Sequence, residues 1–288
     1  MRVAEILQWA GLQLEQAGIE DPELDARLLL EYQLQKTRTE LFLAAQSLLD
    51  REQVSRYQEH IARRRRKEPI AYILGQREFW GLDFKVTPDV LIPRPETEFM
   101  IEQVLARCNP DCFISEKIID LCCGSGVIAA VLAVETGCKI LAADIAEDAL
   151  EIARFNFVRL GIDDKISLFQ GDLLASLPED SLSLVVSNPP YVSRAEVLYN
   201  LPDEVRLYEP HLALDGGEEG LDLVTRIRGQ LDSRLCSGGE LFMEIGADQK
   251  EAVLALFRST GESGKGFSEI EVIKDYAGRD RVLHAVKA

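Results

Sequence analysis

The sequence contains no apolar run that approaches the roughly 18 consecutive residues needed to cross a membrane. Its first residues, Met1 to Glu5, begin an amphipathic pattern and lack the apolar core and cleavage site of a secretory signal. We therefore expect a cytoplasmic protein that does not associate with a membrane.

Residues that commonly bind metals are few and dispersed. The 6 cysteines include no C-x-x-C pair, and the chain is too long for a small secreted disulfide scaffold. The three histidines, His60, His211 and His284, lie far apart and show no zinc-ligand spacing. We therefore expect no metal site.

Basic charge is also scarce, and the shortage lies in one part of the chain. The net charge is −17; residues 1–75 hold 11 basic and 12 acidic side chains, and the remaining residues hold 21 and 37. Proteins that bind duplex nucleic acid usually carry a basic face that displaces counterions from phosphates. Direct binding to nucleic acid is therefore disfavoured, although a local basic patch would suffice for it.

One basic run, Arg63–Lys67, is an exception to this shortage. It ends a predicted helix, where cations interact favourably with the helix dipole and are usually solvated. The alternative is a contact surface for an acidic or RNA partner. The sequence leaves both interpretations open.

Apolar residues recur at helical spacing through the first 67 or so residues. Asp21-Pro22, Thr39, and Asp50 with Gln53 predict three helix starts. Residues 76–98 hold aromatic residues interrupted by glycines and prolines, which indicates a hairpin or extended linker. The prolines at 93 and 95 exclude helix there, so the next helix is predicted from Thr97. We divide the chain into a helical N-terminal domain (1–75), a linker (76–98) and a third part (99–288).

From residue 117 onward, strand and helix patterns alternate. The predicted helices cover residues 127–134, 147–160 and 221–235. The predicted strands cover residues 118–121, 139–143, 166–170, 182–187, 239–245, 269–274 and 281–286. Such alternation predicts an α/β fold with a mostly parallel sheet covered by helices on both faces.

A short turn, Cys122-Cys123-Gly124-Ser125-Gly126, follows the first of these strands and opens a helix. Its glycines permit a tight turn and a close approach of a ligand to the backbone. The spacing is close to the G-x-G-x-G turn of nucleotide-binding methyltransferases, with Cys122 at the first glycine position. A plain tight turn without a ligand is the alternative. We call these five residues the glycine turn.

Two aspartates follow the next two strands. Asp144 ends a strand 18 residues after Gly126, where a carboxylate can accept both hydroxyls of a ribose; it would otherwise cap the helix that follows. Asp172 could accept from an adenine amino group, with Leu173 or Ile145 packing on the ring. A loop cap and a buried leucine are the alternative for Asp172 and Leu173.

The tetrapeptide Asn188-Pro189-Pro190-Tyr191, which we call the NPPY loop, follows the strand at 182–187. Because the carboxyl ends of parallel strands share one edge of a sheet, we expect this loop to lie beside the glycine turn, where open α/β sheets bind ligands. The Asn188 oxygen and the Pro189 carbonyl can accept the two N–H groups of a planar nitrogen, and the prolines stiffen the backbone. Tyr191 offers a flat face for stacking. This set predicts methyl transfer from S-adenosylmethionine (SAM) to a planar nitrogen.

These residues resemble the HemK/PrmC family, whose members methylate the glutamine side chain in the Gly-Gly-Gln loop of peptide chain release factors. The resemblance covers nearly the whole chain. Beyond the NPPY loop it rests on 69–75, Glu78–Leu82, Leu91–Glu98, Tyr208–Pro210 and Ala213–Gly217. It implies a small helical N-terminal domain joined by a hairpin to a seven-stranded, Rossmann-like SAM-binding domain, with release factors as protein partners.

The resemblance also implies roles for residues. Cys122–Gly126, Asp144 and Leu173 match the family's SAM contacts, Asn188 matches the residue that touches SAM and glutamine, and the NPPY loop matches the glutamine-binding loop. Cys122 departs from the family's usual glycine. A side chain there would crowd the methionine end of SAM or require a relaxed backbone, so we expect weaker or shifted binding at most.

Two other functions stay open from the sequence. The same Asn-Pro-Pro-Tyr loop serves enzymes that methylate exocyclic amines of nucleic-acid bases, which must first be extruded or captured. Because the glycine turn is altered, the protein could also be a non-catalytic SAM-binding partner of another protein. Methyl transfer to an oligonucleotide would favour the base methyltransferase. A lack of SAM binding would favour the non-catalytic protein.

Overall fold

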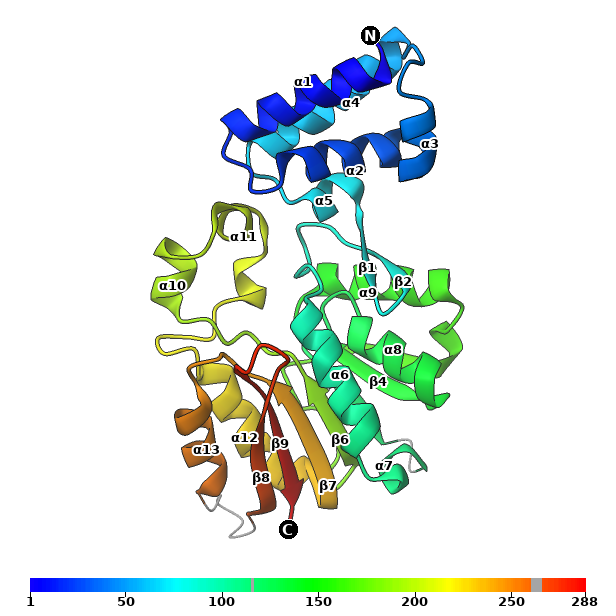
Figure 1. Ribbon diagram of the computed structural model, residues 1–288. Coiled ribbons are helices and arrows are strands. Elements are labelled where there is room, and N and C mark those ends of the chain that lie inside the picture. Colours follow the sequence, from blue (N-terminus) through cyan, green and yellow to red (C-terminus); the bar gives the residue numbers. More distant parts are fainter. Residues whose placement is uncertain (115–116, 260–265) are drawn as a thin grey trace. The chain divides into compact units, whose positions relative to one another are not determined.

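The computed structural model describes residues 1–114, 117–259 and 266–288, which form two compact units (Figure 1). The first unit holds residues 1–76 together with residues 202–208, and the second holds the remaining described residues. In the described residues, no helix is both long and apolar enough to cross a membrane.

The first unit is helical, as predicted. It contains α1 (Val3–Gln16), α2 (Pro22–Leu34), α3 (Arg38–Leu43), α4 (Arg51–Arg65), α5 (Ile70–Leu74) and α11 (Asp203–Tyr208). Asp50 and Gln53 form the predicted capping box. The predicted cap at Thr39 is wrong: Thr37 caps α3, because Glu40 lies three residues after it and completes a capping box.

The basic run Arg63–Lys67 is largely engaged by the first unit itself. Arg64 is buried and pairs with Asp25 and Glu204, each at 2.6 Å. Arg63 pairs with Glu68, and the Lys67 ammonium donates to a backbone carbonyl. The run is therefore not simply a solvated face, and Arg64 ties residues 202–208 to the helices of this unit.

The predicted hairpin consists of β1 (Gln76–Phe79) and β2 (Leu82–Lys85), and all of it after Gln76 belongs to the second unit. The helix after it, α6 (Pro95–Arg107), starts two residues earlier than predicted. Pro95 occupies its first turn, where the missing N–H has no helical partner to lose. The prolines therefore set the start of this helix instead of excluding it.

A seven-stranded sheet forms the centre of the second unit, in the order β5-β4-β3-β6-β7-β9-β8. Only β9 runs antiparallel to its neighbours, β7 and β8. The mostly parallel α/β fold is confirmed. The strands are β3 (Ile118–Leu121), β4 (Ile140–Asp144), β5 (Ile166–Gln170), β6 (Leu182–Ser187), β7 (Leu235–Glu244), β8 (Phe267–Lys274) and β9 (Asp280–Lys287).

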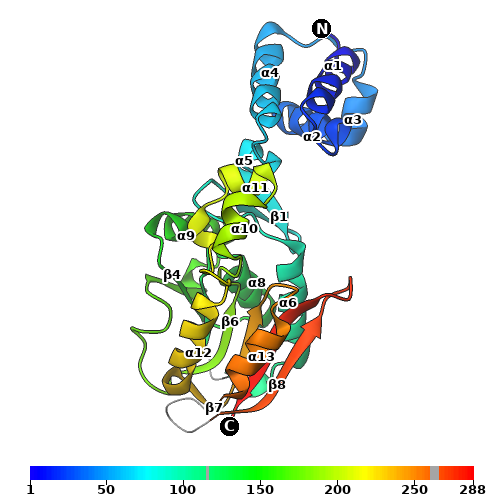
Figure 2. The same cartoon turned by 90° about the vertical axis from the view of Figure 1, so that its left-hand side faces the viewer.

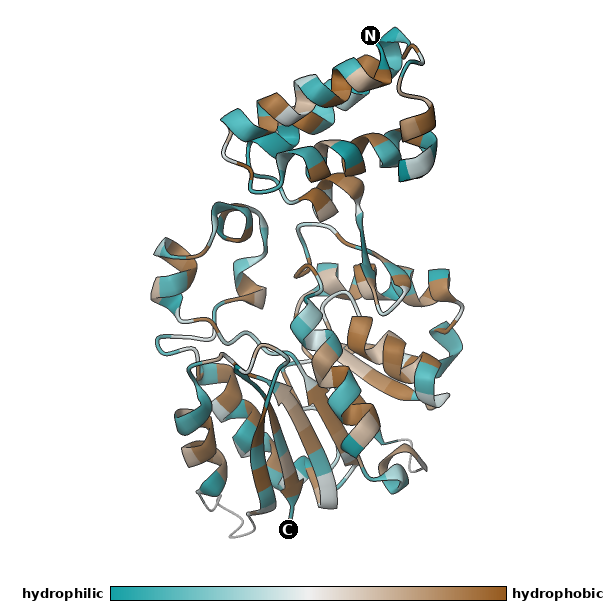
Figure 3. Ribbon diagram, viewed as in Figure 1, coloured by the Kyte–Doolittle hydropathy of each residue, from teal (hydrophilic) through white to brown (hydrophobic). Residues whose placement is uncertain are grey.

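Helices cover both faces of this sheet because successive strand residues point to opposite sides. Ile118 packs in one core with α6, α8 (Val127–Thr136) and α9 (Glu147–Leu160). Ile119 packs in the other core with α12 (Asp222–Arg234) and α13 (Lys250–Arg258), which lie side by side in Figure 2. Every residue of the central strands β3 and β6 is buried, and only Asp120, Ser183 and Ser187 among them are polar. The mostly apolar character of β6 is visible in Figure 3. The short helices α7 (Pro110–Ile114) and α10 (Arg194–Tyr199) complete the unit.

Candidate active site

The residues predicted to carry chemistry follow four adjacent parallel strands. The glycine turn follows β3, Asp144 ends β4, Asp172 follows β5 and the NPPY loop follows β6. The carboxyl ends of these strands meet at one edge of the sheet, where α/β folds bind ligands. A cavity of about 380 Å³ opens at this edge.

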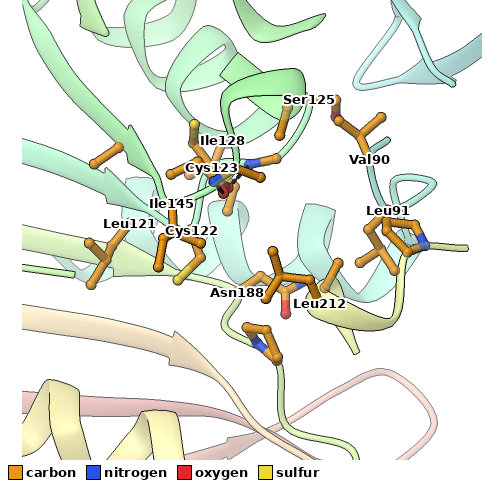
Figure 4. A pocket seen from close by; sticks show the side chains of 18 of the residues that line it. Val90, Leu91, Leu121, Cys122, Cys123, Ser125, Ile128, Ile145, Asn188 and Leu212 are labelled. Atoms are coloured by element: carbon orange, nitrogen blue, oxygen red, sulfur yellow. Dashed lines mark hydrogen bonds between the residues drawn. The ribbon is translucent and has the colours of Figure 1, made fainter. Parts of the chain in front are cut away.

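Most of the predicted residues line this cavity. Its wall includes Cys122, Cys123, Gly124, Ser125, Asp144, Asp172, Leu173, Asn188 and Pro190, whereas Gly126, Pro189 and Tyr191 are not among the residues that line it. Figure 4 shows Cys122 and Cys123 on one side and Val90 and Leu91 on the other, with Asn188 between them. The segment before α6 thus supplies a wall, a role that its two prolines alone do not reveal.

The three left-handed residues of the glycine turn serve different purposes. Gly124 has φ +52° and would carry a Cβ into open space, so its backbone is accessible from the cavity. Gly126 has φ +81°, and a Cβ there would lie 2.5 Å from Phe157 Cζ. Gly126 is therefore required for the packing of α8 against α9, whereas Gly124 leaves room for a ligand. Cys122 adopts φ +60° without being glycine.

Asp144 is held in place by two backbone N–H groups. Its Oδ2 accepts from Gly124 at 2.9 Å and its Oδ1 accepts from Ala146 at 3.0 Å. Each carboxylate oxygen retains capacity for a second hydrogen bond. The carboxylate thus ties β4 to the glycine turn and still faces the cavity. Asp144 does not cap α9, because Ala146 is the N-cap and no side chain accepts from the first N–H groups of that helix. The ribose contact of Asp144 stays a prediction.

Asp172 lies at the rim of the cavity and is paired. Its Oδ2 accepts from Arg226 Nη2 at 2.6 Å, and both side chains are about half exposed. Arg226 also lines the cavity and had no predicted role. Leu173 is buried, lines the cavity and adopts φ +55°. Leu173 therefore offers an apolar surface beside the paired carboxylate.

The NPPY loop is fixed by neighbouring glycines and by buried polar groups. A Cβ at Gly216 would lie 2.8 Å from the Pro190 carbonyl oxygen, and one at Gly220 would lie 2.2 Å from the Tyr191 carbonyl oxygen. Gln249 Nε2 donates to the Tyr191 carbonyl at 2.8 Å. These contacts give a structural reason why the family resemblance includes the segment around Gly216 as well as the NPPY loop.

The side chains of the loop point in different directions. Asn188 lines the cavity, and its Nδ2 donates to Thr97 Oγ1 at 3.0 Å. The Tyr191 hydroxyl donates to Glu244 Oε1 at 2.9 Å, so its phenol end is directed into the protein. Burial raises the pKa of Glu244, whereas hydrogen bonds from Thr97 and Tyr191 and the charge of Arg281 favour its ionised form.

Folding also brings together Cys108, Cys112 and Glu240, whose ligand atoms lie within 4.8 Å of one another. Their sequence spacing gave no sign of this. The Glu240 oxygens are already bonded to the Asn109 N–H at 2.8 Å and to His284 Nε2 at 2.7 Å. The cluster is thus internally hydrogen-bonded, and the predicted absence of a metal stays a prediction.

Comparison with known proteins identifies the family. The family model described as PrmC N-terminal domain matches residues 5–75, and the one described as Methyltransferase small domain matches residues 96–205. The release factor glutamine methyltransferase of Caulobacter vibrioides is 40% identical, over 95% of this chain and 92% of its own. That of Moorella thermoacetica is 40% identical over 100% of this chain and 99% of its own.

The chain belongs to the release factor glutamine methyltransferase family. The predicted family is thus confirmed. A methyltransferase from Pyrococcus furiosus has a similar fold, with a TM-score of 0.52 and 18% identity, over 82% of this chain and 98% of its own. As a member of this family, the protein is an enzyme, and it contains a Rossmann-like domain.

Replacing Cys122 with glycine should tighten SAM binding. Cys122 lines the cavity, where its side chain would crowd the methionine end of SAM, and glycine removes that side chain. Burial, with the charges of Asp144 and Asp120, raises the pKa of the Cys122 thiol, which stays neutral. Titration calorimetry should show Kd falling about threefold for Cys122→Gly.

The variant Cys122→Ala keeps the backbone strain and removes only the sulfur. An equal gain in Cys122→Ala would assign the effect to the sulfur, and weaker binding by Cys122→Gly would contradict the prediction. Neither variant is expected to melt below the wild type.

Asp120 should make stability depend on pH. Burial raises its pKa to about 7, against the hydrogen bond that its Oδ2 accepts from the Ala129 N–H. The unfolded carboxyl titrates near 3.9, so only the folded state holds the proton between these values. The stabilisation is therefore present at low pH and is lost as pH rises through about 7.

The isosteric variant Asp120→Asn keeps the acceptor for Ala129 and does not titrate. Its melting temperature, measured between about pH 5 and pH 8, should rise relative to wild type by several degrees as pH increases. Parallel melting curves for the two proteins would contradict this assignment.

Proposed function

We propose that this enzyme transfers the methyl group of SAM to the side-chain amide nitrogen (N5) of the glutamine in the Gly-Gly-Gln motif of peptide chain release factors. One observation carries the proposal. The NPPY loop at the end of β6 and the glycine turn at the end of β3 contribute to the same cavity. This arrangement supports amide binding by the loop next to nucleotide binding by the turn. The names of the full-length relatives support the same substrate.

The cofactor side of this proposal uses the edge formed by β3, β4 and β5. We propose that the Asp144 carboxylate accepts the ribose hydroxyls and that Leu173 packs on the adenine, with Asp172 near its amino group. Backbone groups of the glycine turn border the methionine end. The proposed SAM contacts are Cys122, Cys123, Gly124, Ser125, Gly126, Asp144, Asp172, Leu173 and Asn188.

The acceptor side must make a poor nucleophile react. The lone pair of an amide nitrogen is delocalised into its carbonyl, so placing the nitrogen in line with the methyl carbon supplies much of the rate. We propose that the Asn188 oxygen and the Pro189 carbonyl accept its two N–H groups, with Pro190 and Tyr191 completing the site. The nitrogen–carbon bond forms as the sulfur–carbon bond breaks. The nitrogen then loses a proton to water or to an acceptor on the loop.

The N-terminal domain, residues 1–75, is proposed to bind the release factor. The acidic remainder of the chain suits a substrate loop that enters ribosomal RNA and is therefore expected to be basic. Release factors act in translation, which places the proposed activity in the cytoplasm. Direct binding to nucleic acid is disfavoured because Arg63, Arg64 and Lys67 bond within their own unit.

A transfer assay tests the substrate class. Purified enzyme and methyl-labelled SAM are incubated separately with release factor, with a release factor whose Gly-Gly-Gln glutamine is replaced by alanine, and with RNA and DNA oligonucleotides. We expect label only in the intact release factor. Label in an oligonucleotide alone would favour a base methyltransferase. Binding of SAM without transfer to any of them would favour a non-catalytic protein.

A further inference from the structure

A chain of buried hydrogen bonds runs from Asn188 in the cavity wall to a carboxylate in the interior. Asn188 Nδ2 donates to Thr97 Oγ1 at 3.0 Å, and the Thr97 hydroxyl donates to Glu244 Oε2 at 2.8 Å. The Tyr191 hydroxyl donates to the other Glu244 oxygen at 2.9 Å. Thr97 is 3% exposed and Glu244 is 1% exposed, so bulk water does not compete for these groups.

The Glu244 carboxylate determines which group donates and which accepts in each of these hydrogen bonds. Both hydroxyls that contact Glu244 donate to it, Thr97 at 2.8 Å and Tyr191 at 2.9 Å, and an ionised carboxylate can only accept. Burial raises the pKa of Glu244, and these two donors and the charge of Arg281 oppose that rise. The Thr97 hydroxyl hydrogen is therefore committed to Glu244. Its oxygen can then only accept from Asn188, which must turn its NH₂ group toward Thr97.

The consequence concerns the oxygen of the same amide. With Nδ2 bound to Thr97, the Asn188 Oδ1 is turned away from Thr97 and stays available as an acceptor. Rotating the amide by half a turn would set two oxygen acceptors against each other without a hydrogen between them. An unsatisfied buried pair of this kind is unfavourable. These hydrogen bonds thus favour one of the two possible orientations of the Asn188 amide.

We infer that Thr97 and Glu244 are positioning residues, which orient Asn188 so that its oxygen meets the N–H of the methyl acceptor. This inference rests on the proposed function, because it assigns the substrate N–H to that oxygen. The three side chains come from the first turn of α6, the end of β7 and the loop after β6. Neither Thr97 nor Glu244 contacts the reacting atoms in this assignment.

Kinetics of matched variants separate positioning from a structural role. Thr97→Val removes the hydroxyl at nearly constant volume, Glu244→Gln introduces a competing donor, and Thr97→Ser keeps the hydroxyl. We expect kcat with release factor to fall about 10- to 100-fold in the first two and to stay within about twofold in Thr97→Ser. The Kd for SAM should stay within about twofold in all three. Added to Asn188→Ala, Thr97→Val should cause no further loss.

A second measurement does not depend on the substrate. In ¹⁵N-labelled protein, the Asn188 side-chain NH₂ resonance, identified by its absence in Asn188→Ala, should be protected from hydrogen exchange in wild type and Thr97→Ser. It should lose protection in Thr97→Val and Glu244→Gln. If the wild type methylates no release factor, the proposed function fails. The hydrogen-exchange measurement would still show how the Asn188 amide is oriented. Unprotected wild-type NH₂, or normal kcat in Thr97→Val, would overturn the inference.

Discussion

The Asn188→Ala variant should lose about a thousandfold in kcat on release factor, the largest effect expected of any single substitution in this enzyme. Alanine removes the side-chain oxygen proposed to hold one N–H of the substrate amide. It also leaves Thr97 without its Asn188 partner. Single-turnover methylation with saturating SAM measures this loss at the chemical step.

The SAM affinity of Asn188→Ala should change much less than its turnover, because most proposed SAM contacts lie on β3, β4 and β5. The matched control is Asn200→Ala, which truncates an exposed asparagine at the end of α10. Near-normal turnover by Asn188→Ala would contradict the mechanism. An equal loss in Asn200→Ala would point to general destabilisation.

The Asp144→Ala variant should weaken SAM binding about 100-fold. A hydrogen bond to a charged group contributes about 1.5–3 kcal/mol, and the proposed carboxylate accepts two ribose hydroxyls. The substitution also frees the Gly124 N–H that the carboxylate holds at 2.9 Å. Titration calorimetry of SAM and of S-adenosylhomocysteine should show comparable losses, since both carry the ribose.

Asp148→Ala provides a control for charge. Asp148 also lines the cavity, in the first turn of the following helix, and its loss removes a negative charge from the cavity wall. We expect only a few-fold weakening of SAM binding in that variant. Equal losses in the two variants would show that net charge, and not ribose binding, explains the effect of Asp144.

Elements with strong local signals could be predicted from the sequence. The boundaries of β3, α9, β5 and β6 match those predicted, because apolar runs and clear glycine stops delimit them. The capping box of Asp50 was also recognised. The errors at Thr39 and Pro95 were local as well, and each came from giving one residue more weight than its neighbours.

Features that depend on tertiary contacts could not be predicted in this way. Thr97 and Glu244 are 147 residues apart, and Thr97 and Asn188 are 91 apart. No local pattern connects them. The grouping of residues 202–208 with the helical unit likewise involves distant partners: Arg64 pairs with Glu204, and the Tyr208 hydroxyl donates to the Arg66 carbonyl. The packing role of Gly126 became visible only with Phe157 in place.

The central claim is that the cavity methylates a glutamine side chain on a protein. Tandem mass spectrometry of the release factor peptide that spans Gly-Gly-Gln, after incubation with enzyme and SAM, tests it most directly. The account predicts one added methyl group, located by fragmentation on the glutamine side chain, and none with Asn188→Ala. An unmodified glutamine, or a methyl group located on another residue, would contradict it.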